Sequence, residues 1–371
     1  SAHLGKLLKR LGGILESMKR KLEARDKAGF ADFVNTSLER SGAGPAHRFT
    51  AGKAKAPPLP ATVPVDGEKV YDLDRQMMYY KDMWEGHWGR FKDQYPELLN
   101  MIHTCTDLAK QDEPDIIVRD DVKRGAHLIP KNTTLGIDHW ETQELRALDD
   151  ESADAFGDLL NDIEKEMTWP IQILLNLIVL MGKPLGGVRP IALMPMLYRL
   201  WSKIRGPAIR QWEAETNGPW DAAVRGSSAL RAAVLGVFFD ELHTLNGDEV
   251  VALLWDMDKF YDSIDVTTLM TKCLEIDYPL RPMVLGIKMH MALRVLKVDV
   301  GYQTCEIPYN GIIAGCLQST SVTKGLLHVV MANHYNRVPK ENLRSFVDDV
   351  SERHAGTEQQ VIMDSIEVGS S

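Results

Sequence analysis

The sequence contains few cysteines, and no arrangement of them indicates disulfide bonds or a structural zinc site. Four cysteines occur in 371 residues, none in a Cys-x-x-Cys pair and none with a histidine partner at zinc-ligand spacing. The longest apolar run, at 171–181, has about half of the roughly 20 residues that a membrane-spanning helix needs. The opening stretch also lacks the apolar core and cleavage site of a signal peptide. These absences exclude disulfide-rich secreted domains and predict an intracellular protein, nuclear or cytoplasmic, with no membrane partner.

The composition is that of an ordinary globular chain, with 44% hydrophobic and 26% charged residues and enough length for two or three domains. Its net charge of −9, taken alone, disfavours nucleic acid as a partner. The charge is unevenly distributed, however, because the segments 1–57 and 169–234 carry +7 and +5, whereas 131–168 and 235–371 carry −8 each. The chain is therefore strongly polarised in charge, which the total does not show.

The first third of the chain predicts helices around a linker. Apolar residues at helical spacing among lysines and arginines predict a basic amphipathic helix near the N-terminus. A stretch rich in Pro, Gly and Ala follows at 41–64, which predicts a linker and a domain boundary near Val65. Aromatic residues at helical spacing in 71–103 then predict two helices that are broken near Pro96.

The hydrophobic pattern of the remaining chain alternates between helices and strands. Apolar runs on either side of the Gly- and Pro-rich turn at 182–187 predict a β-hairpin. The apolar run at 250–255 predicts a buried strand that ends in acidic residues. The other predicted elements are helices at 149–167, 198–212, 227–245 and 317–335, a mostly helical stretch at 269–296, and a strand at 343–350.

Acidic residues gather at two of these predicted strands. Asp256 directly follows the first strand, and the pair Asp348-Asp349 lies between apolar residues in the second. Carboxylates at the end of a buried strand raise the free energy of the fold unless something compensates their charge. Two divalent cations, Mg²⁺ or Mn²⁺, held by carboxylates from two strands would compensate it and would serve an in-line phosphoryl displacement. We therefore predict a two-metal site formed by acids from these two strands.

An Asp-Asp pair alone is common in turns, so the combination with other motifs carries the argument. The motifs that occur in order along the chain are Gly-x-Asp ending at Asp138, the hairpin at 183–191, Asp256 followed five residues later by Tyr261, Gly-x-x-x-Gly-x-x-x-Ser at 311–319, and Phe-Val-Asp-Asp at 346–349. In this order of motifs the chain resembles the reverse transcriptases, most closely those of non-LTR retrotransposons, over roughly residues 130–352.

The resemblance implies a right-hand polymerase fold of the α/β (α+β) class. A fingers hairpin with helices and an antiparallel palm sheet with helices would follow a helical N-terminal extension. The predicted segments are the basic helix and linker at 1–64, the helical extension at 65–130, the fingers at 131–234 and a partial palm at 235–371.

The resemblance also implies RNA-directed DNA polymerase activity, with an RNA template, a DNA primer and dNTPs as partners. Two metal ions would assist nucleotidyl transfer to the primer 3′-hydroxyl, which makes Asp256, Asp348 and Asp349 catalytic residues as well as metal ligands. Tyr261 would be the steric gate that excludes a 2′-hydroxyl. The other implied nucleotide-binding residues are Lys183 and Arg189 in the fingers hairpin, and Gly315 and Ser319 in the glycine-rich loop.

The sequence also departs from the family pattern. Ala314, Thr320 and Phe260 stand where the family usually has Gln, Pro and a small residue. Only 21 residues follow Val350, too few for the remaining palm motifs and a thumb, and no endonuclease region is visible. We therefore expect a fragment whose thumb and endonuclease belong to a longer polyprotein.

Two alternative functions stay open at this point. An RNA-dependent RNA polymerase shares the palm and its acids, and Asp262 beside the gate keeps that alternative open, although Tyr261 favours deoxynucleotides. The truncation and the departures suggest the second alternative, a catalytically silent remnant that binds nucleic acid. Stacking of bases on tryptophans is a weaker interpretation, because large aromatics at these spacings are expected in the core. The tryptophans concerned are Trp84, Trp88, Trp201, Trp212 and Trp255.

Overall fold

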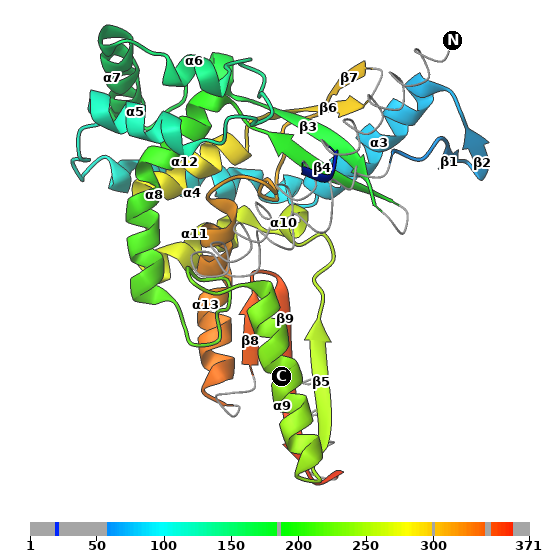
Figure 1. The fold of residues 1–371 in the computed structure, drawn as a ribbon. Helices are drawn as coiled ribbons and strands as arrows, with labels where there is room; N and C mark the ends of the chain where they lie inside the picture. Colours follow the sequence, from blue (N-terminus) through cyan, green and yellow to red (C-terminus); the bar gives the residue numbers. More distant parts are fainter. Residues whose placement is uncertain (1–18, 22–57, 184–186, 299–300, 338–342, 359–371) are drawn as a thin grey trace, which may run out of the picture. The chain divides into compact units, whose positions relative to one another are not determined.

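The computed structural model describes residues 19–21, 58–183, 187–298, 301–337 and 343–358. The chain separates into two compact units, Ser1–Lys55 and Ala56–Ser371, so the division falls inside the predicted linker. In the first unit only the helical residues 19–21 are described, and the rest of the predicted amphipathic helix lies outside the described residues. The helices and strands of the second unit are labelled in Figure 1. None of its described helices is long and apolar enough to cross a membrane.

Two helices near the start of this unit confirm the expected break at Pro96. A short hairpin, β1 (Val63–Val65) and β2 (Glu68–Val70), leads into α3 (Leu73–Trp88), and α4 (Tyr95–Ala109) follows a single 3-10 turn. Pro96 lies in the first turn of α4, where its missing N–H costs no helical hydrogen bond. Trp84 and Trp88 of α3 are buried, as expected of core residues.

The Gly-x-Asp motif joins the segment before α6 (Thr142–Arg146) to the start of α8 (Met196–Thr216). The Asp138 carboxylate accepts hydrogen bonds from the backbone N–H groups of Met196 at 2.5 Å and Leu197 at 3.2 Å. Gly136 leaves no room for a side chain, because a Cβ there would lie 2.3 Å from the carbonyl oxygen of Met194. Both residues of the motif are therefore explained by how the chain packs against the start of α8.

Two helices flank this motif region. α5 (Arg119–Leu128) packs against α7 (Asp150–Glu166) and α8. The acidic helix predicted at 149–167 is confirmed as α7, and the Asp149 side chain caps it by accepting a hydrogen bond from the N–H of Ser152.

One sheet has four strands in the order β4-β3-β6-β7. The predicted hairpin is confirmed as β3 (Leu175–Gly182) and β4 (Val188–Leu193), which pair antiparallel. β6 (Leu293–Val298) pairs parallel with β3, and β7 (Gly301–Thr304) completes the sheet. The expectation of a mostly helical stretch to residue 296 is wrong for 293–296, because the apolar pattern of the preceding helix, α12 (Leu280–His290), continues into the strand.

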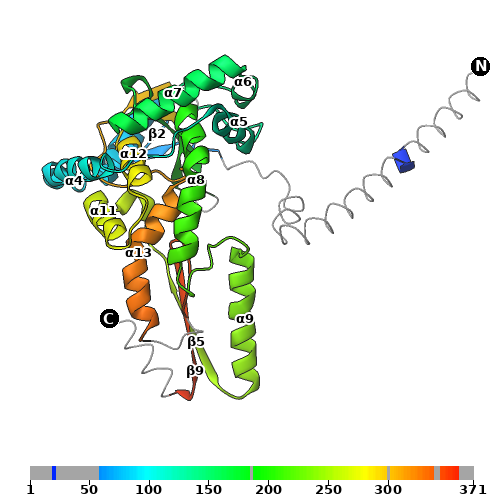
Figure 2. The same cartoon turned by 90° about the vertical axis from the view of Figure 1, so that its left-hand side faces the viewer.

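The second sheet has three antiparallel strands in the order β5-β9-β8. These are β5 (Glu249–Trp255), β8 (Leu343–Phe346) and β9 (Asp349–Gly356). α9 (Ala229–Leu245) and α13 (Ser319–Tyr335) lie on opposite sides of this sheet, as Figure 2 shows. The expectation that the first strand is buried is wrong, because β5 forms one edge of the sheet, with Leu254 75% and Trp255 43% exposed.

Three further helices connect the two sheets along the chain. They are α10 (Phe260–Ser263), α11 (Val266–Glu275) and α12 (Leu280–His290). Most of the buried apolar side chains form one cluster that extends from Val63 to Val322. A smaller cluster packs α13 against the three-stranded sheet and consists of Trp220, Met331, Leu343 and Val350.

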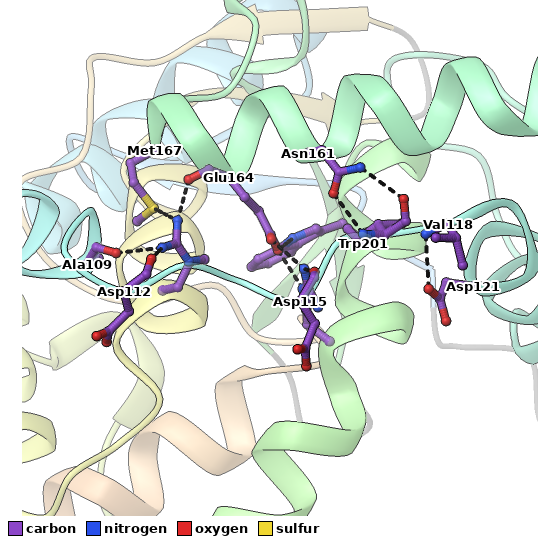
Figure 3. Close-up of polar contacts among 12 residues, drawn as sticks. Ala109, Asp112, Asp115, Val118, Asp121, Asn161, Glu164, Met167 and Trp201 are labelled. Carbon is purple, nitrogen blue, oxygen red and sulfur yellow. Dashed lines mark hydrogen bonds and ion pairs between the residues drawn. The ribbon is translucent and has the colours of Figure 1, made fainter.

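A buried polar network holds the segment between α4 and α5 (Figure 3). The Glu164 carboxylate, fully buried in α7, accepts hydrogen bonds from Trp201 Nε1 at 2.7 Å and from Arg205 Nε at 2.6 Å. Arg205 also donates to the carbonyl of Asp115 at 2.6 Å. Arg281 donates to the carbonyls of Ala109, Asp112 and Glu164. Two arginines from α8 and α12 thus fix a segment that forms no helix or strand.

Candidate active site

The strand register brings the two predicted acidic points together. Trp255 of β5 is paired with Val350 of β9, and Asp256 directly follows this last pair. Phe346 of β8 is paired with Asp349, so Asp348 lies in the two-residue turn between β8 and β9. Because neighbouring strands lie about 4.8 Å apart, the backbone of Asp256 lies beside Asp349, the first residue of β9, and close to the turn that carries Asp348. Asp256, Asp348 and Asp349 thus share one end of the three-stranded sheet.

The three carboxylates have no compensating partner within the described part of the chain. Asp256 and Asp349 are exposed, Asp348 is half-buried, and none of them forms an ion pair or a side-chain hydrogen bond with a described residue. The described residues contain no group of three His, Cys, Asp or Glu side chains already placed as metal ligands. Mg²⁺ usually takes only one or two protein carboxylates and completes its shell with waters and substrate phosphates. The donor set therefore fits a hard divalent cation without a preformed cage.

Tyr261 lies close to these acids. It belongs to α10 and is half-buried, and burial raises the pKa of its phenol, with a further increase from the negative charge of Asp348. The nearby hydroxyl groups of Thr320 and Thr323, at the start of α13, lower the same pKa. The predicted gate therefore lies near Asp348 and near the start of α13, where Thr320 is one of the departures from the family pattern.

The glycine-rich loop at 311–319 runs alongside α10, the helix that carries Tyr261. The N–H of Ile312 donates to the carbonyl of Tyr261 at 2.9 Å. Gly311 and Gly315 have φ angles of 77° and 95°, which favour glycine. Ser319 is buried, and its hydroxyl donates to the carbonyl of Ile313 at 2.7 Å. In this structure Ser319 therefore closes the loop, and its predicted nucleotide contact stays a prediction.

A buried histidine holds the middle of this loop. The N–H of Ile313 donates to Nδ1 of His290 at 3.0 Å. Burial, together with a smaller effect of the nearby Arg294 charge, lowers the pKa of His290 from its ordinary 6.5 to about 3. The ring is therefore neutral at physiological pH, as an acceptor nitrogen requires.

The pKa of His290 predicts a specific loss of stability in acid. The folded pKa is depressed, so below pH 6.5 the unfolded chain binds a proton that the folded chain does not. The free energy of unfolding should fall by about 1.4 kcal/mol per pH unit between 6.5 and about 3 on this account. Urea unfolding at several pH values measures this loss as the difference in unfolding free energy between the wild type and His290→Asn. The amide oxygen of the asparagine can replace Nδ1 as acceptor. A difference between the two proteins that does not change with pH would contradict the assignment.

The two predicted triphosphate-binding cations lie together at the tip of the β3–β4 hairpin. Lys183 directly follows β3, and its N–H donates to the carbonyl of Gly187 at 3.0 Å. Arg189 is in β4, opposite Met181. Both side chains are exposed, and no ion pair joins either one to Asp256 or to another acid in the described ranges. The structure therefore places these two cations near each other at the hairpin tip. They belong to a different sheet from the acids.

A cavity of about 360 Å³ adds two basic residues that the sequence did not single out. Arg199 and Lys203 of α8 line it, together with the end of β4 and Gly315 of the glycine-rich loop. Burial lowers the pKa of both basic groups, and the charge of Arg210 lowers that of Lys203 as well. Their four-residue spacing in a segment of net charge +5 was the available sequence signal.

Neither a scan against protein-family models nor a search of the curated proteins finds a match for this chain.

Proposed function

We propose that this chain is the polymerase part of a retroelement reverse transcriptase, an RNA-directed DNA polymerase. The observation that carries the proposal is the strand register, in which Trp255 opposite Val350 brings Asp256 beside the turn of Asp348 and Asp349. Acids from two separate strands that meet with no ionic partner in the described structure can hold a divalent cation between them. The position of Tyr261 near Asp348 adds a second element of a nucleotide site.

Each residue has a defined task in this proposal. Asp256 and Asp348 hold the divalent cations, and Asp349 supports them from the same turn. When bound, two such ions lower the pKa of the primer hydroxyl and stabilise the charge on the leaving pyrophosphate. Arg189 and Lys183 bind the triphosphate of the incoming nucleotide, and Arg189 can do so with two parallel hydrogen bonds.

The cavity between β4, α8 and the glycine-rich loop supports the assignment of a nucleic-acid template. Arg199 and Lys203 provide positive charge there, and Gly315 has no side chain that would keep a strand away. The cavity walls are otherwise largely apolar, as a surface that stacks or packs against bases requires. Positive charge at this cavity and negative charge on the three-stranded sheet are thus separated. The basic residues can bind a phosphate backbone while the acids bind metal ions.

The surroundings of Asp262 weigh against selection of ribonucleotides. A polymerase that selects a 2′-hydroxyl needs a polar side chain directed at the sugar, whereas the Asp262 carboxylate accepts a hydrogen bond from Trp88 Nε1 at 2.8 Å. Burial raises the pKa of Asp262, as expected for a group turned into the protein. The aromatic ring of Tyr261 is then left as the group beside the sugar.

Primer extension on an RNA template tests the proposal. The wild-type chain should incorporate dNTPs in preference to rNTPs with Mg²⁺ or Mn²⁺. Tyr261→Ala should raise rNTP incorporation relative to dNTP by roughly tenfold to a hundredfold, because it removes the ring that excludes the 2′-hydroxyl. Tyr261→Phe keeps the ring and should keep the preference.

Two results would contradict this function. A wild-type preference for rNTPs would indicate an RNA-dependent RNA polymerase. Absence of extension with either nucleotide, together with absence of Mn²⁺ binding, would leave a silent nucleic-acid-binding remnant.

A further inference from the structure

The end of helix α3 is hydrogen-bonded to the residue next to the predicted gate. Trp88, the last residue of α3, donates its indole N–H to Oδ1 of Asp262 at 2.8 Å across 174 positions of sequence. Asp262 directly follows Tyr261 in α10. Trp88 is only 3% exposed, so this bond is sheltered from water. A residue of the predicted N-terminal extension is thereby hydrogen-bonded to α10, directly beside Tyr261.

A buried arginine stacks on the same indole and extends the connection. The guanidinium carbon of Arg294 lies 4.4 Å from the centre of the Trp88 ring, and the side chain is 1% exposed. Its Nη2 donates to the carbonyls of Gly311 and His290, each at 3.3 Å. Burial lowers the pKa of Arg294 to about 10, and the negative charge of Asp262 opposes that decrease. Trp88 thus contacts both a buried cation and the carboxylate whose charge partly compensates it.

The beginning of the glycine-rich loop is bound to the same residues through the backbone. The N–H of Tyr309 donates to the carbonyl of Trp88 at 2.8 Å. Asn310 Nδ2 donates to the carbonyl of Asp262 at 2.8 Å and to that of His87 at 3.0 Å. Gly311 packs so closely that a Cβ would lie 2.8 Å from the carbonyl oxygen of Asp262. The end of α3, the turn after Tyr261 and the start of the loop therefore form one hydrogen-bonded unit.

We propose that Trp88 and Asp262 are positioning residues, through which the N-terminal extension sets the placement of Tyr261 and of the loop at 311–319. The proposal rests on the function proposed above. It assigns control of nucleotide binding to α3, a helix that is far in sequence from the nucleotide-binding residues. Tyr261 and the loop would contact the nucleotide, whereas the acids belong to the three-stranded sheet. Loss of the bond should therefore raise KM for dNTP much more than it lowers kcat.

The neighbouring residue Trp84 provides a matched control. It lies one turn earlier in α3, is 2% exposed, and its indole centroid is 5.6 Å from that of Trp88. Its Nε1 has no hydrogen-bond partner among the described residues. Replacing either tryptophan by Phe removes the same atoms from the same helix, but only Trp88→Phe breaks a bond to Asp262.

The experiment measures steady-state primer extension and amide hydrogen exchange of the full chain and its variants. Trp88→Phe should raise KM for dNTP about tenfold, the value of one hydrogen bond to a charged group, and leave kcat within about twofold. Exchange should accelerate in 256–263 and 309–319. Trp84→Phe should change neither quantity, and Asp262→Asn, which keeps an acceptor for the indole, should change both less than Trp88→Phe does.

Each outcome decides whether Trp88 positions Tyr261 and the loop or only packs in the core. Equal KM values and equal exchange rates in the two Phe variants would overturn the proposal. If Trp88→Phe does not fold, Asp262→Asn is compared with Asp262→Leu, and equal effects of these two would overturn it instead. If the wild type extends no primer, the proposed function fails, and the exchange rates of the two segments still decide whether Trp88 positions them.

Discussion

Asp256→Asn is expected to reduce metal-dependent primer extension at least about a hundredfold, because it removes a charged ligand from the reacting centre. Asp256 is exposed and has no ion pair with another described residue, so the folded state should lose less than about 0.5 kcal/mol. Removing one of three neighbouring negative charges lowers their mutual repulsion in the metal-free protein. This variant should therefore lose its activity and keep its stability.

Asp258→Asn is the control for this prediction. Asp258 lies two residues further along, with its side chain 82% exposed and paired with Lys259. Single-turnover extension with Mg²⁺ and with Mn²⁺, and the Mn²⁺-dependent shift of the unfolding midpoint, measure catalysis and ion binding separately. If both variants extended primers at the wild-type rate, Asp256 would not be a metal ligand and the two-metal mechanism would be wrong.

The acidic end of the three-stranded sheet could be anticipated because its signals are local. Asp256 follows a run of apolar strand residues, and Asp348 lies between apolar residues, so each strand end is visible in a few positions of sequence. Their meeting depends only on antiparallel pairing of the two strands, which the register confirms. The exposure of β5 was missed for the same reason, since a local apolar run does not tell a central strand from an edge strand.

The connection between Trp88 and Asp262 could not be anticipated. Trp88 was expected in the core, and it is buried there, but helical spacing does not tell which residue receives the indole N–H. The same holds for Arg294, whose charge within an apolar stretch gave no indication that it would stack on that indole. The parallel pairing of β6 with β3 was missed as well, because it joins residues more than 100 positions apart. Long-range partners of this kind are fixed by the tertiary packing and not by local pattern.

Glu164→Leu is expected to destabilise the fold by about 3–5 kcal/mol, the largest loss of stability among the changes considered. Glu164 is fully buried, and its carboxylate accepts the Trp201 indole N–H and two N–H groups of Arg205. Without it the Arg205 guanidinium, only 16% exposed, keeps its charge but loses its anion. The segment around Asp115 should loosen too, because Arg205 also binds the carbonyl of that residue.

Asp150 of the same helix provides the control, since its carboxylate is 64% exposed and pairs with Arg119 and Lys123. Asp150→Asn should cost less than about 1 kcal/mol, as ion pairs in water usually do. The double change Glu164→Leu with Arg205→Leu separates two explanations of the loss. If the cost comes from an unpaired buried charge, the double variant should be more stable than Glu164→Leu alone, because no charge is left buried. If urea unfolding shows the double variant to be the less stable one, the loss comes from the broken hydrogen bonds to Trp201 and Asp115, and the buried-charge account is wrong.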